Sequence, residues 1–209
     1  MGIKERKRRE RNERKELILR AAKKAYMEDG WYSTTMEKIA EKAELSRATL
    51  YLYYKTKDHI FIDAVTSFLE NLSAMLEDLY LRIEEVKENL LRELWQVFVD
   101  FYHTDPEMFS IGLLFIQREM LPALPKELRD PLDEAGSRNH YNIFRIIEYG
   151  VKGNFFSKAD PRALTEVVWS TFLGVVHIEN MKKSISKKGH LESTLELAYE
   201  ILERGICVG

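Results

Sequence analysis

Residues 34–61 of the chain read TTMEKIAEKAELSRATLYLYYKTKDHIF. Apolar residues recur in this stretch at helical spacing, in two short runs that a two-residue turn separates. Thr34 with Glu37 forms a capping box that can open the first short helix, and Ser46 can cap the second. Two short helices joined so closely predict a helix-turn-helix, in which the second helix enters the major groove of DNA.

The side chains of these two helices divide between an inner and an outer face. The inner face is expected to hold the helices together through Ile39, Ala43, Leu45 and Leu50. On the outer face, Arg47 can bind guanine O6 and N7, while the methyl groups of Ala48 and Thr49 can contact a thymine methyl group. These three outer residues are therefore the expected readers of base sequence.

Other residues near the two helices are expected to contact phosphate, which positions a protein without reading the sequence. Thr35 and Lys57 lie at predicted helix N-termini, where backbone amides and the helix dipole attract anions. The expected phosphate contacts are Thr35, Tyr51, Tyr54 and Lys57, and Tyr53 also lies outside the inner face. An alternative is that the three tyrosines cover the core of the domain.

This run, with a predicted helix before it that ends at Gly30, resembles the N-terminal domain of the TetR family of bacterial transcriptional regulators. The resemblance covers roughly residues 13–65. The family's T-L-Y-x-Y/H-F-x-x-K pattern corresponds here to residues 49–57, with Tyr54 in place of the usual phenylalanine. Glu44 stands where the family commonly has glycine in the turn. The resemblance implies a homodimer that binds a two-fold operator, with a divergent helical C-terminal domain that binds an inducer and the partner subunit.

The charges of the chain are unevenly distributed. Residues 1–60 hold 16 Lys and Arg against 10 Asp and Glu, whereas the whole 209-residue chain has a formal net charge of −2. The first 15 residues alone hold eight basic and three acidic side chains. A basic beginning on an acidic body suggests a polyanion-binding domain. The alternative is a solvated, partly disordered tail.

Composition excludes several classes of protein. A single cysteine, Cys207, excludes an intramolecular disulfide and a cysteine-based zinc site, and suits a reducing cytoplasm. No run approaches the ~18 consecutive apolar residues of a membrane span, and the basic beginning lacks the apolar stretch of a signal peptide. Few Gly and Pro residues and no apolar alternation argue against a sheet-rich fold.

Helical periodicity continues to the end of the chain, and predicts an all-α protein of about nine helices. Asp-Pro pairs, which place an N-cap before a proline tolerated at the first helical position, mark three of the later helix starts. The expected domains are a basic tail with the helix-turn-helix (1–56) and a helical ligand-binding and dimerisation domain (57–209). The expected helices are 57–80, 86–104, 106–121, 131–150, 161–183 and 190–206.

The predicted helix 161–183 is apolar almost all round, which indicates burial on most sides. A second subunit can supply the missing cover, with helix 190–206 beside it, so we expect a symmetric four-helix dimer seam. A core helix of a monomer is the alternative. The expected seam residues are Val168, Phe172, Val175, Leu195, Ala198 and Leu202.

The predicted helix 106–121 places Arg118 on the same side as its apolar residues, where an unpaired charge is costly. Either an internal carboxylate or the acid group of a ligand can pair with it. The neighbouring helices offer aromatic and polar-tipped side chains, a mixture that suits either a ligand cavity or an ordinary core. The candidate ligand-binding residues are Trp95, Phe98, Tyr102, Phe115, Arg118, Tyr141, Phe144, Trp169 and His177.

The sequence offers no catalytic or metal-binding constellation: its five histidines are isolated, and it has no glycine-rich phosphate loop or G-x-S-x-G motif. We therefore expect a cytoplasmic, ligand-responsive transcriptional regulator, a repressor that binds a palindromic operator as a homodimer without a cofactor. Its expected ligand is small and amphiphilic or apolar, with an acidic end that Arg118 holds, and no membrane partner is expected. The alternatives are a helical DNA-binding protein with an architectural role and no inducer, and an enzyme that uses the C-terminal bundle.

Overall fold

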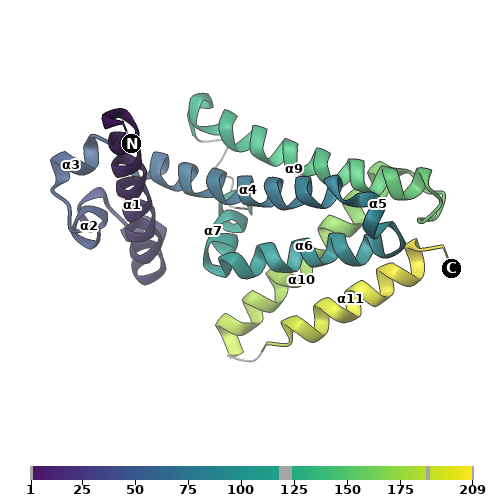
Figure 1. Cartoon of the computed structure of the whole chain (residues 1–209). Helices are drawn as coiled ribbons and strands as arrows, with labels where there is room; N and C mark the ends of the chain where they lie inside the picture. The colour runs from purple at the N-terminus through teal and green to yellow at the C-terminus, as the bar shows by residue number, and fades with distance from the viewer. Residues whose placement is uncertain (1, 118–123, 187–188, 209) are drawn as a thin grey trace. The chain divides into compact units, whose positions relative to one another are not determined.

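The computed structural model describes residues 2–117, 124–186 and 189–208, which form helices joined by short connections (Figure 1). The all-α prediction is confirmed, and the β-type pairing within the described ranges is limited to an isolated bridge between Phe156 and Cys207. No helix in the described part has both the length and the apolar content needed to span a membrane. The elements are α1 (Ile3–Ser33), α2 (Met36–Lys42), α3 (Arg47–Tyr51), α4 (Lys57–Leu81), α5 (Ile83–Val86), the 3-10 turn η1 (Lys87–Asn89), α6 (Leu90–Thr104), α7 (Pro106–Gln117), α9 (Lys126–Lys152), α10 (Pro161–Ser186) and α11 (Leu191–Ile206).

The chain forms two compact units. The first unit comprises residues 1–67 and 124–132, and the second comprises residues 68–123 and 133–209. Helices α4 and α9 each contribute residues to both units. The domain division at residue 56 stays a prediction.

The core of the first unit joins α1 to the three helices that follow it. Ile18, Ala22 and Ala25 of α1 are buried, together with Ile39 of α2 and Leu50 of α3. The small alanine side chains let the backbones of neighbouring helices approach closely, and the aliphatic residues fill the space between them. This packing fixes α2 and α3 against the longer helices.

The junction between α1 and α2 differs by one residue from the expectation. Gly30 interrupts the helical geometry with a φ of 76°, a conformation that glycine adopts without steric cost, so the predicted stop at this residue is confirmed. The Thr34 hydroxyl then donates to the Gly30 carbonyl at 2.8 Å. Because Thr34 is used in this way, the expected capping box that begins at Thr34 is wrong, and Thr35 is the N-cap whose hydroxyl accepts from the Lys38 amide at 3.3 Å.

In the second unit, α9 runs parallel to the later part of α4 (Figure 1). The Asn139 amide donates to the Leu69 carbonyl at 2.9 Å, and the Asn142 amide donates to the Ser73 hydroxyl at 3.2 Å. Further along, the Tyr149 hydroxyl donates to Glu84 at 2.7 Å. Both side-chain amides are buried, so these bonds spare polar groups that would otherwise lose contact with water.

Two helix starts differ from the prediction. Helix α9 begins at Lys126 and not at residue 131, because the Pro125 carbonyl accepts from the Leu128 and Arg129 amides at 3.0 and 3.3 Å. Pro131 therefore lies inside the helix, where its missing N–H costs one backbone hydrogen bond. Helix α6 begins at Leu90, after the short α5 and η1, and not at residue 86. The predicted end of the helix at residue 121 lies outside the described residues.

The chain after α11 is fastened to the loop between α9 and α10. The Ser157 amide donates to the Ile206 carbonyl at 2.7 Å, and the Val208 amide donates to the Phe155 carbonyl at 3.1 Å. Phe156 lies against Gly150, where an added Cβ atom would be 2.3 Å from its ring. We call this arrangement, residues 155–157 with 206–208, the C-terminal clasp.

Candidate functional site

The turn between α2 and α3 brings the two helices together as a helix-turn-helix. The predicted cap at Ser46 is confirmed, since its hydroxyl oxygen accepts from the Thr49 amide at 3.1 Å. The Leu45 amide donates back to the Ala40 carbonyl at 2.9 Å, which closes the turn. Glu44 has a φ of 53°, in the left-handed region that glycine favours. The turn therefore keeps its geometry although glutamate occupies the position.

Helix α3 presents a polar and aromatic face to solvent. Arg47, Ala48 and Tyr51 are exposed, while Thr49 and Tyr53 are half-buried. This face is opposite Leu50, which is fully buried in the core of the first unit. A short, firmly packed helix with an exposed Arg and small methyl-bearing side chains has the geometry that major-groove reading requires.

An ion pair and a hydrogen bond hold two of the predicted readers. The Arg47 guanidinium lies 3.1 Å from the Glu37 carboxylate of α2. The pKa of Glu37 is lowered, chiefly by hydrogen bonds from its own backbone amide and from Thr35, with a smaller contribution from Arg47. The Thr49 hydroxyl lies 2.8 Å from the Ser46 hydroxyl, so its methyl group is the part left to meet a base.

The structure places Tyr54 in the core of the first unit, although the sequence analysis expected it to contact phosphate. Its side chain is 5% exposed, and its hydroxyl donates to Asp63. Burial and this hydrogen bond raise the pKa of Tyr54, so the phenol stays protonated. Lys15 lies 3.0 Å from the same carboxylate and above the Tyr54 ring. The alternative of a core-covering tyrosine therefore fits this residue better.

Lys57 is half-buried, and its ammonium group is bound by backbone carbonyls. Its ammonium group donates to the Trp31 carbonyl at 2.7 Å and to the Thr34 carbonyl at 3.0 Å. It lies 4.6 Å from the centre of the Trp31 ring, and burial lowers its pKa. These bonds hold the end of α1 to the start of α4, so the ammonium group that was expected to contact phosphate is already held by protein carbonyls. The carbonyls at the end of α1, left without helical partners, attract the cation.

Leu52, which the sequence analysis did not assign to the interface, is 79% exposed. It is the C-cap residue of α3 and follows Tyr51 directly in sequence. An exposed leucine at this point can contact thymine methyl groups or sugar atoms. The sequence carries one signal for this exposure: Leu52 lies between Tyr51 and Tyr53 and does not continue the helical spacing of the buried apolar residues.

Three of the described residues that were predicted to line a ligand cavity, Trp95, Phe98 and Trp169, lie together in the second unit. Phe98 packs against Trp169 and Phe172 with ring centres 4.9 and 5.4 Å apart, and Trp95 lies 5.7 Å from Phe172. These rings fill the core of the second unit with edge-to-face and tilted contacts. Tyr141 is exposed. The described part therefore favours the core interpretation for Trp95 and Phe98.

Other predicted ligand residues differ in position. Tyr102 donates to the Asn180 side chain at 3.1 Å and borders an open cleft near the start of α11. Phe144, Trp169 and His177 are half-buried. Arg118 lies outside the described residues, and so does the side chain of Phe115.

Most residues of the predicted dimer seam are buried within the subunit, where a partner cannot contact them. Val168 and Phe172 are completely buried within the subunit, and Leu195 and Leu202 are buried as well. Phe172 is buried because its ring packs against Trp95 and Phe98 of α6. Only Val175 and Ala198 of the predicted set keep partial exposure.

A different apolar stripe is exposed on these two helices. On α10, Ile178, Met181 and Ile185 are three and four residues apart, Val167 lies eleven residues before Ile178 on the same face, and the stripe continues on the neighbouring α11. We call it the α10–α11 stripe. Its large apolar residues are Val167, Ile178, Met181, Ile185, Leu197 and Ile201.

Comparisons with known proteins agree with this geometry. The family model described as "Bacterial regulatory proteins, tetR family" matches residues 18–64. The uncharacterized HTH-type transcriptional regulator YhgD of Bacillus subtilis is 25% identical over 171 residues, which cover 78% of this chain and 83% of that protein.

Two solved structures show the same fold. The TetR family transcriptional regulator PfmR from Thermus thermophilus has a TM-score of 0.73 and 22% identity, covering 90% of this chain and 97% of that one. The transcriptional regulator FadR from Bacillus subtilis, solved in complex with stearoyl-CoA, has a TM-score of 0.67 and 23% identity, covering 89% and 96%.

Proposed function

Because this chain belongs to the tetR family of bacterial regulatory proteins, we propose that it represses transcription as a homodimer on a palindromic operator, under the control of a small ligand. The observation that carries the proposal is the exposed face of α3, with Arg47, Ala48 and Tyr51 outside and Leu50 buried beneath them. That helix is capped at Ser46 and packed against α2, so its exposed side chains are held in fixed positions.

In this mechanism α3 lies in the major groove. Arg47 leaves the Glu37 carboxylate and binds a guanine through two hydrogen bonds, while the methyl groups of Ala48 and Thr49 meet thymine methyl groups. Thr35, at the start of α2, and the exposed Tyr51 contact the phosphates on either side. Lys57 and Tyr54 act from inside the first unit, where they hold α1, α3 and α4 in register.

The Arg47→Ala variant tests this assignment. An operator selected from random DNA should bind the variant with about 1–3 kcal/mol less free energy than the parent and with relaxed preference at one position of each half-site. Fluorescence anisotropy with labelled duplexes measures both effects. The Lys87→Ala variant removes the same charge from the second unit and should bind like the parent. Equal affinity of Arg47→Ala and Lys87→Ala for the selected operator would show that α3 does not read DNA.

A second copy of the chain is the proposed partner for the α10–α11 stripe. Exposed apolar residues at helical spacing on two adjacent helices match the cover that the same stripe on another copy would provide. A two-fold dimer then presents two copies of α3, as a palindromic site requires.

Charged substitutions within the stripe test the proposed dimer. Ile178→Glu and Ile201→Glu should each give monomers in light scattering, because the new carboxylate would be buried without a partner. Leu81→Glu is the matched control, since Leu81 is equally apolar and 79% exposed but lies on α4. Dimers of both stripe variants would exclude this interface.

The proposed ligand is amphiphilic, with an apolar body and an acidic end held by Arg118. The FadR structure with stearoyl-CoA supports an acyl chain as the kind of group that this fold can accommodate. Helix α4 belongs to both compact units, so a ligand that shifts α4 can change the separation of the two copies of α3. A few ångströms are sufficient, because successive major grooves lie about 34 Å apart.

Titration of long-chain fatty acids and their CoA esters, against parent and Arg118→Ala protein with operator DNA present, tests the ligand. Weaker binding to the variant, with a change of operator affinity in the parent, is the expected result. Equal binding to both proteins would show that Arg118 does not hold the acid group of the ligand. Operator affinity that no ligand changes would favour the architectural alternative.

A further inference from the structure

The first half of helix α1 sorts its charges onto two faces. At about 100° of rotation per residue, the side chains of six basic residues fall within an arc of about 120°. We call this arc the cationic face. Its members are Lys4, Lys7, Arg8, Arg11, Arg14 and Lys15.

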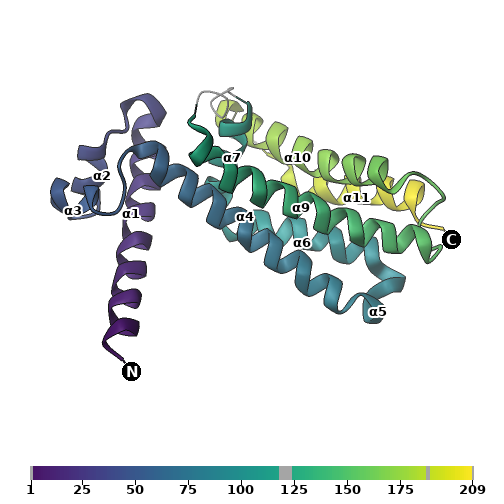
Figure 2. The same ribbon diagram turned by 90° about the horizontal axis from the view of Figure 1, so that it is seen from above.

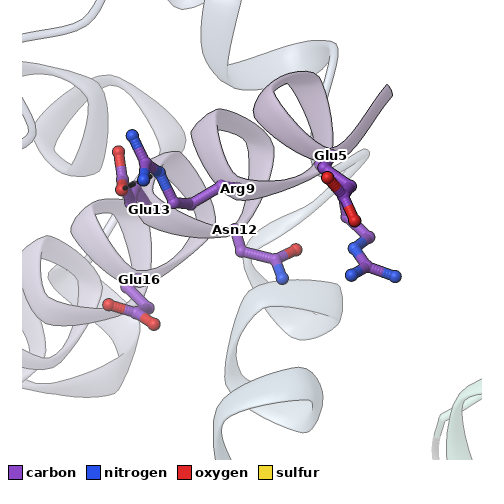
Figure 3. Close-up of a pocket in the computed structure, with 6 residues that line it drawn as sticks. Glu5, Arg9, Asn12, Glu13 and Glu16 are labelled. Carbon is purple, nitrogen blue, oxygen red and sulfur yellow. Dashed lines mark ion pairs between the residues drawn. The ribbon is translucent and has the colours of Figure 1, made fainter. Parts of the chain in front are cut away.

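The opposite side of the same helix is neutralised by acidic residues. Arg6 pairs with Glu10 at 3.0 Å, and Arg9 pairs with Glu13 at 3.3 Å. Figure 3 shows this side, with the Arg9–Glu13 pair beside Asn12 and Glu16. Glu10 and Glu13 are thus paired with arginines outside the cationic face, and Arg8, at the edge of that face, lines the same groove as Glu5 and Glu16.

Within the described residues, the first five members of the cationic face make no ion pair, while Lys15 reaches Asp63. Basic residues three and four positions apart on a helix repel one another by a few tenths of a kcal/mol per pair. Interleaving the acidic residues would have stabilised the helix better. The arrangement therefore costs stability in the free protein, which indicates that an anionic partner compensates for it.

The cationic face is continuous with the buried face of α1. Ile18, Ala22 and Ala25 lie on the same side of the helix, one to three turns further along, and are buried in the first unit. Lys15, at the junction, contacts Asp63 and lies above the Tyr54 ring that follows α3. The helix before Lys15 projects beyond α2 and α3 (Figure 2). The cationic face therefore lies on the same side of α1 as the residues that pack against the other helices of the first unit.

We infer that the cationic face binds the phosphates of DNA that flanks the sequence read by α3; this inference rests on the proposed function. Twelve helical residues before Lys15 span about 18 Å, and each DNA strand carries one phosphate per about 3.4 Å of the duplex axis, so a helix that lies along that axis spans about five phosphates of a strand. The helix is unbroken from Ile3 to Asp29, which holds the face at a fixed position on the first unit. The match to the family model begins at residue 18, after this face ends.

Two triple variants of equal charge test the inference. The first replaces Lys7, Arg11 and Arg14 with Gln on the cationic face. The control replaces Arg6, Arg9 and Arg20 with Gln, three arginines that are each paired with a glutamate on the opposite side. Circular dichroism checks that the helix is kept in both.

Binding is measured on a duplex of the selected operator alone and on one extended by about ten base pairs, roughly one helical turn, at each end. The parent and the control should bind the extended duplex more tightly, and the cationic-face variant should lose that gain. Three lost phosphate contacts lower the slope of log K against log salt by about 2.7, so between 50 and 200 mM salt the parent's affinity should fall about 40-fold more than the variant's.

Equal losses in the two triple variants would attribute the effect to net charge and overturn the inference, as would unchanged binding of the cationic-face variant. A loss seen on vesicles containing phosphatidylglycerol and not on DNA would assign the face to a lipid surface and also overturn it. Because phosphate contacts ignore sequence, a scrambled extended duplex gives the same comparison. Failure of the proposed function, in contrast, appears as a parent protein that does not distinguish the operator from the scrambled duplex.

Discussion

Replacing Glu44 with glycine should stabilise the first unit. Glu44 lies in the turn between α2 and α3 with a φ of 53°, where its Cβ atom crowds the backbone. Its side chain makes no hydrogen bond or ion pair with the described residues, so its removal sacrifices little. The substitution therefore changes mainly the backbone strain of one residue.

The magnitude follows from two opposing contributions. The left-handed conformation costs an ordinary residue about 1–2 kcal/mol, which glycine avoids. Glycine loses about 0.5–1 kcal/mol more backbone entropy on folding. The free energy of unfolding should thus rise by about 0.5–1 kcal/mol, which for a chain of this size corresponds to about 1–4 °C in melting temperature.

Thermal denaturation measures the shift, and hydrogen exchange of the Ile39 and Leu50 amides locates it in the first unit. Glu44→Ala is the matched control, because it removes the carboxylate and keeps the Cβ atom. The alanine variant should melt at or near the parent's temperature. If it gains as much stability as Glu44→Gly, the cause is the lost charge, and the reasoning from φ is refuted.

Two further substitutions test the internal bonds of each unit. Lys57→Met keeps the aliphatic stem but leaves the Trp31 and Thr34 carbonyls without their donor. The free energy of unfolding, measured by urea titration, should therefore fall by about 1–3 kcal/mol. An unchanged urea midpoint would contradict the role given to the ammonium group. The pKa of Glu196 is lowered, chiefly by the hydrogen bond from Arg92. The ionised carboxylate therefore stabilises the fold above the ordinary carboxyl pKa of 4.5. This contribution is lost as the pH falls through the lower pKa of the folded state. Glu196→Gln should therefore weaken the dependence of the free energy of unfolding on pH below the ordinary carboxyl pKa. If parent and variant lose stability equally as the pH falls in this range, the Arg92–Glu196 contact does not contribute as described.

Local signals predicted the helix-turn-helix well. The Ser46 cap and the Gly30 stop depend on chemistry within three or four residues, which the sequence displays directly. Tyr54 and Lys57 were harder, because their partners lie 9 and 23 to 26 residues away along the chain. Spacing alone does not reveal which carbonyl or carboxylate the fold brings to a side chain.

In the second unit, periodicity predicted the helices better than their orientation. Helix α10 carries apolar residues on nearly every side, so its sequence pattern does not show which of two apolar faces is buried in the core. Phe172 and Val168 turned inward because aromatic rings from α6 were available to pack against them, whereas Ile178 stayed outside. That choice depends on the shapes of neighbouring helices, which a single helix pattern does not contain.

The C-terminal clasp has a consequence for association. Because residues 206–208 are hydrogen-bonded to the loop that leads into α10, helix α11 cannot slide by a turn, about 5.4 Å, along its neighbour without breaking two backbone bonds. The exposed residues of the two helices are therefore already aligned before any partner arrives. A partner that contacts both helices meets a preorganised surface, and less of its binding free energy is spent on ordering that surface.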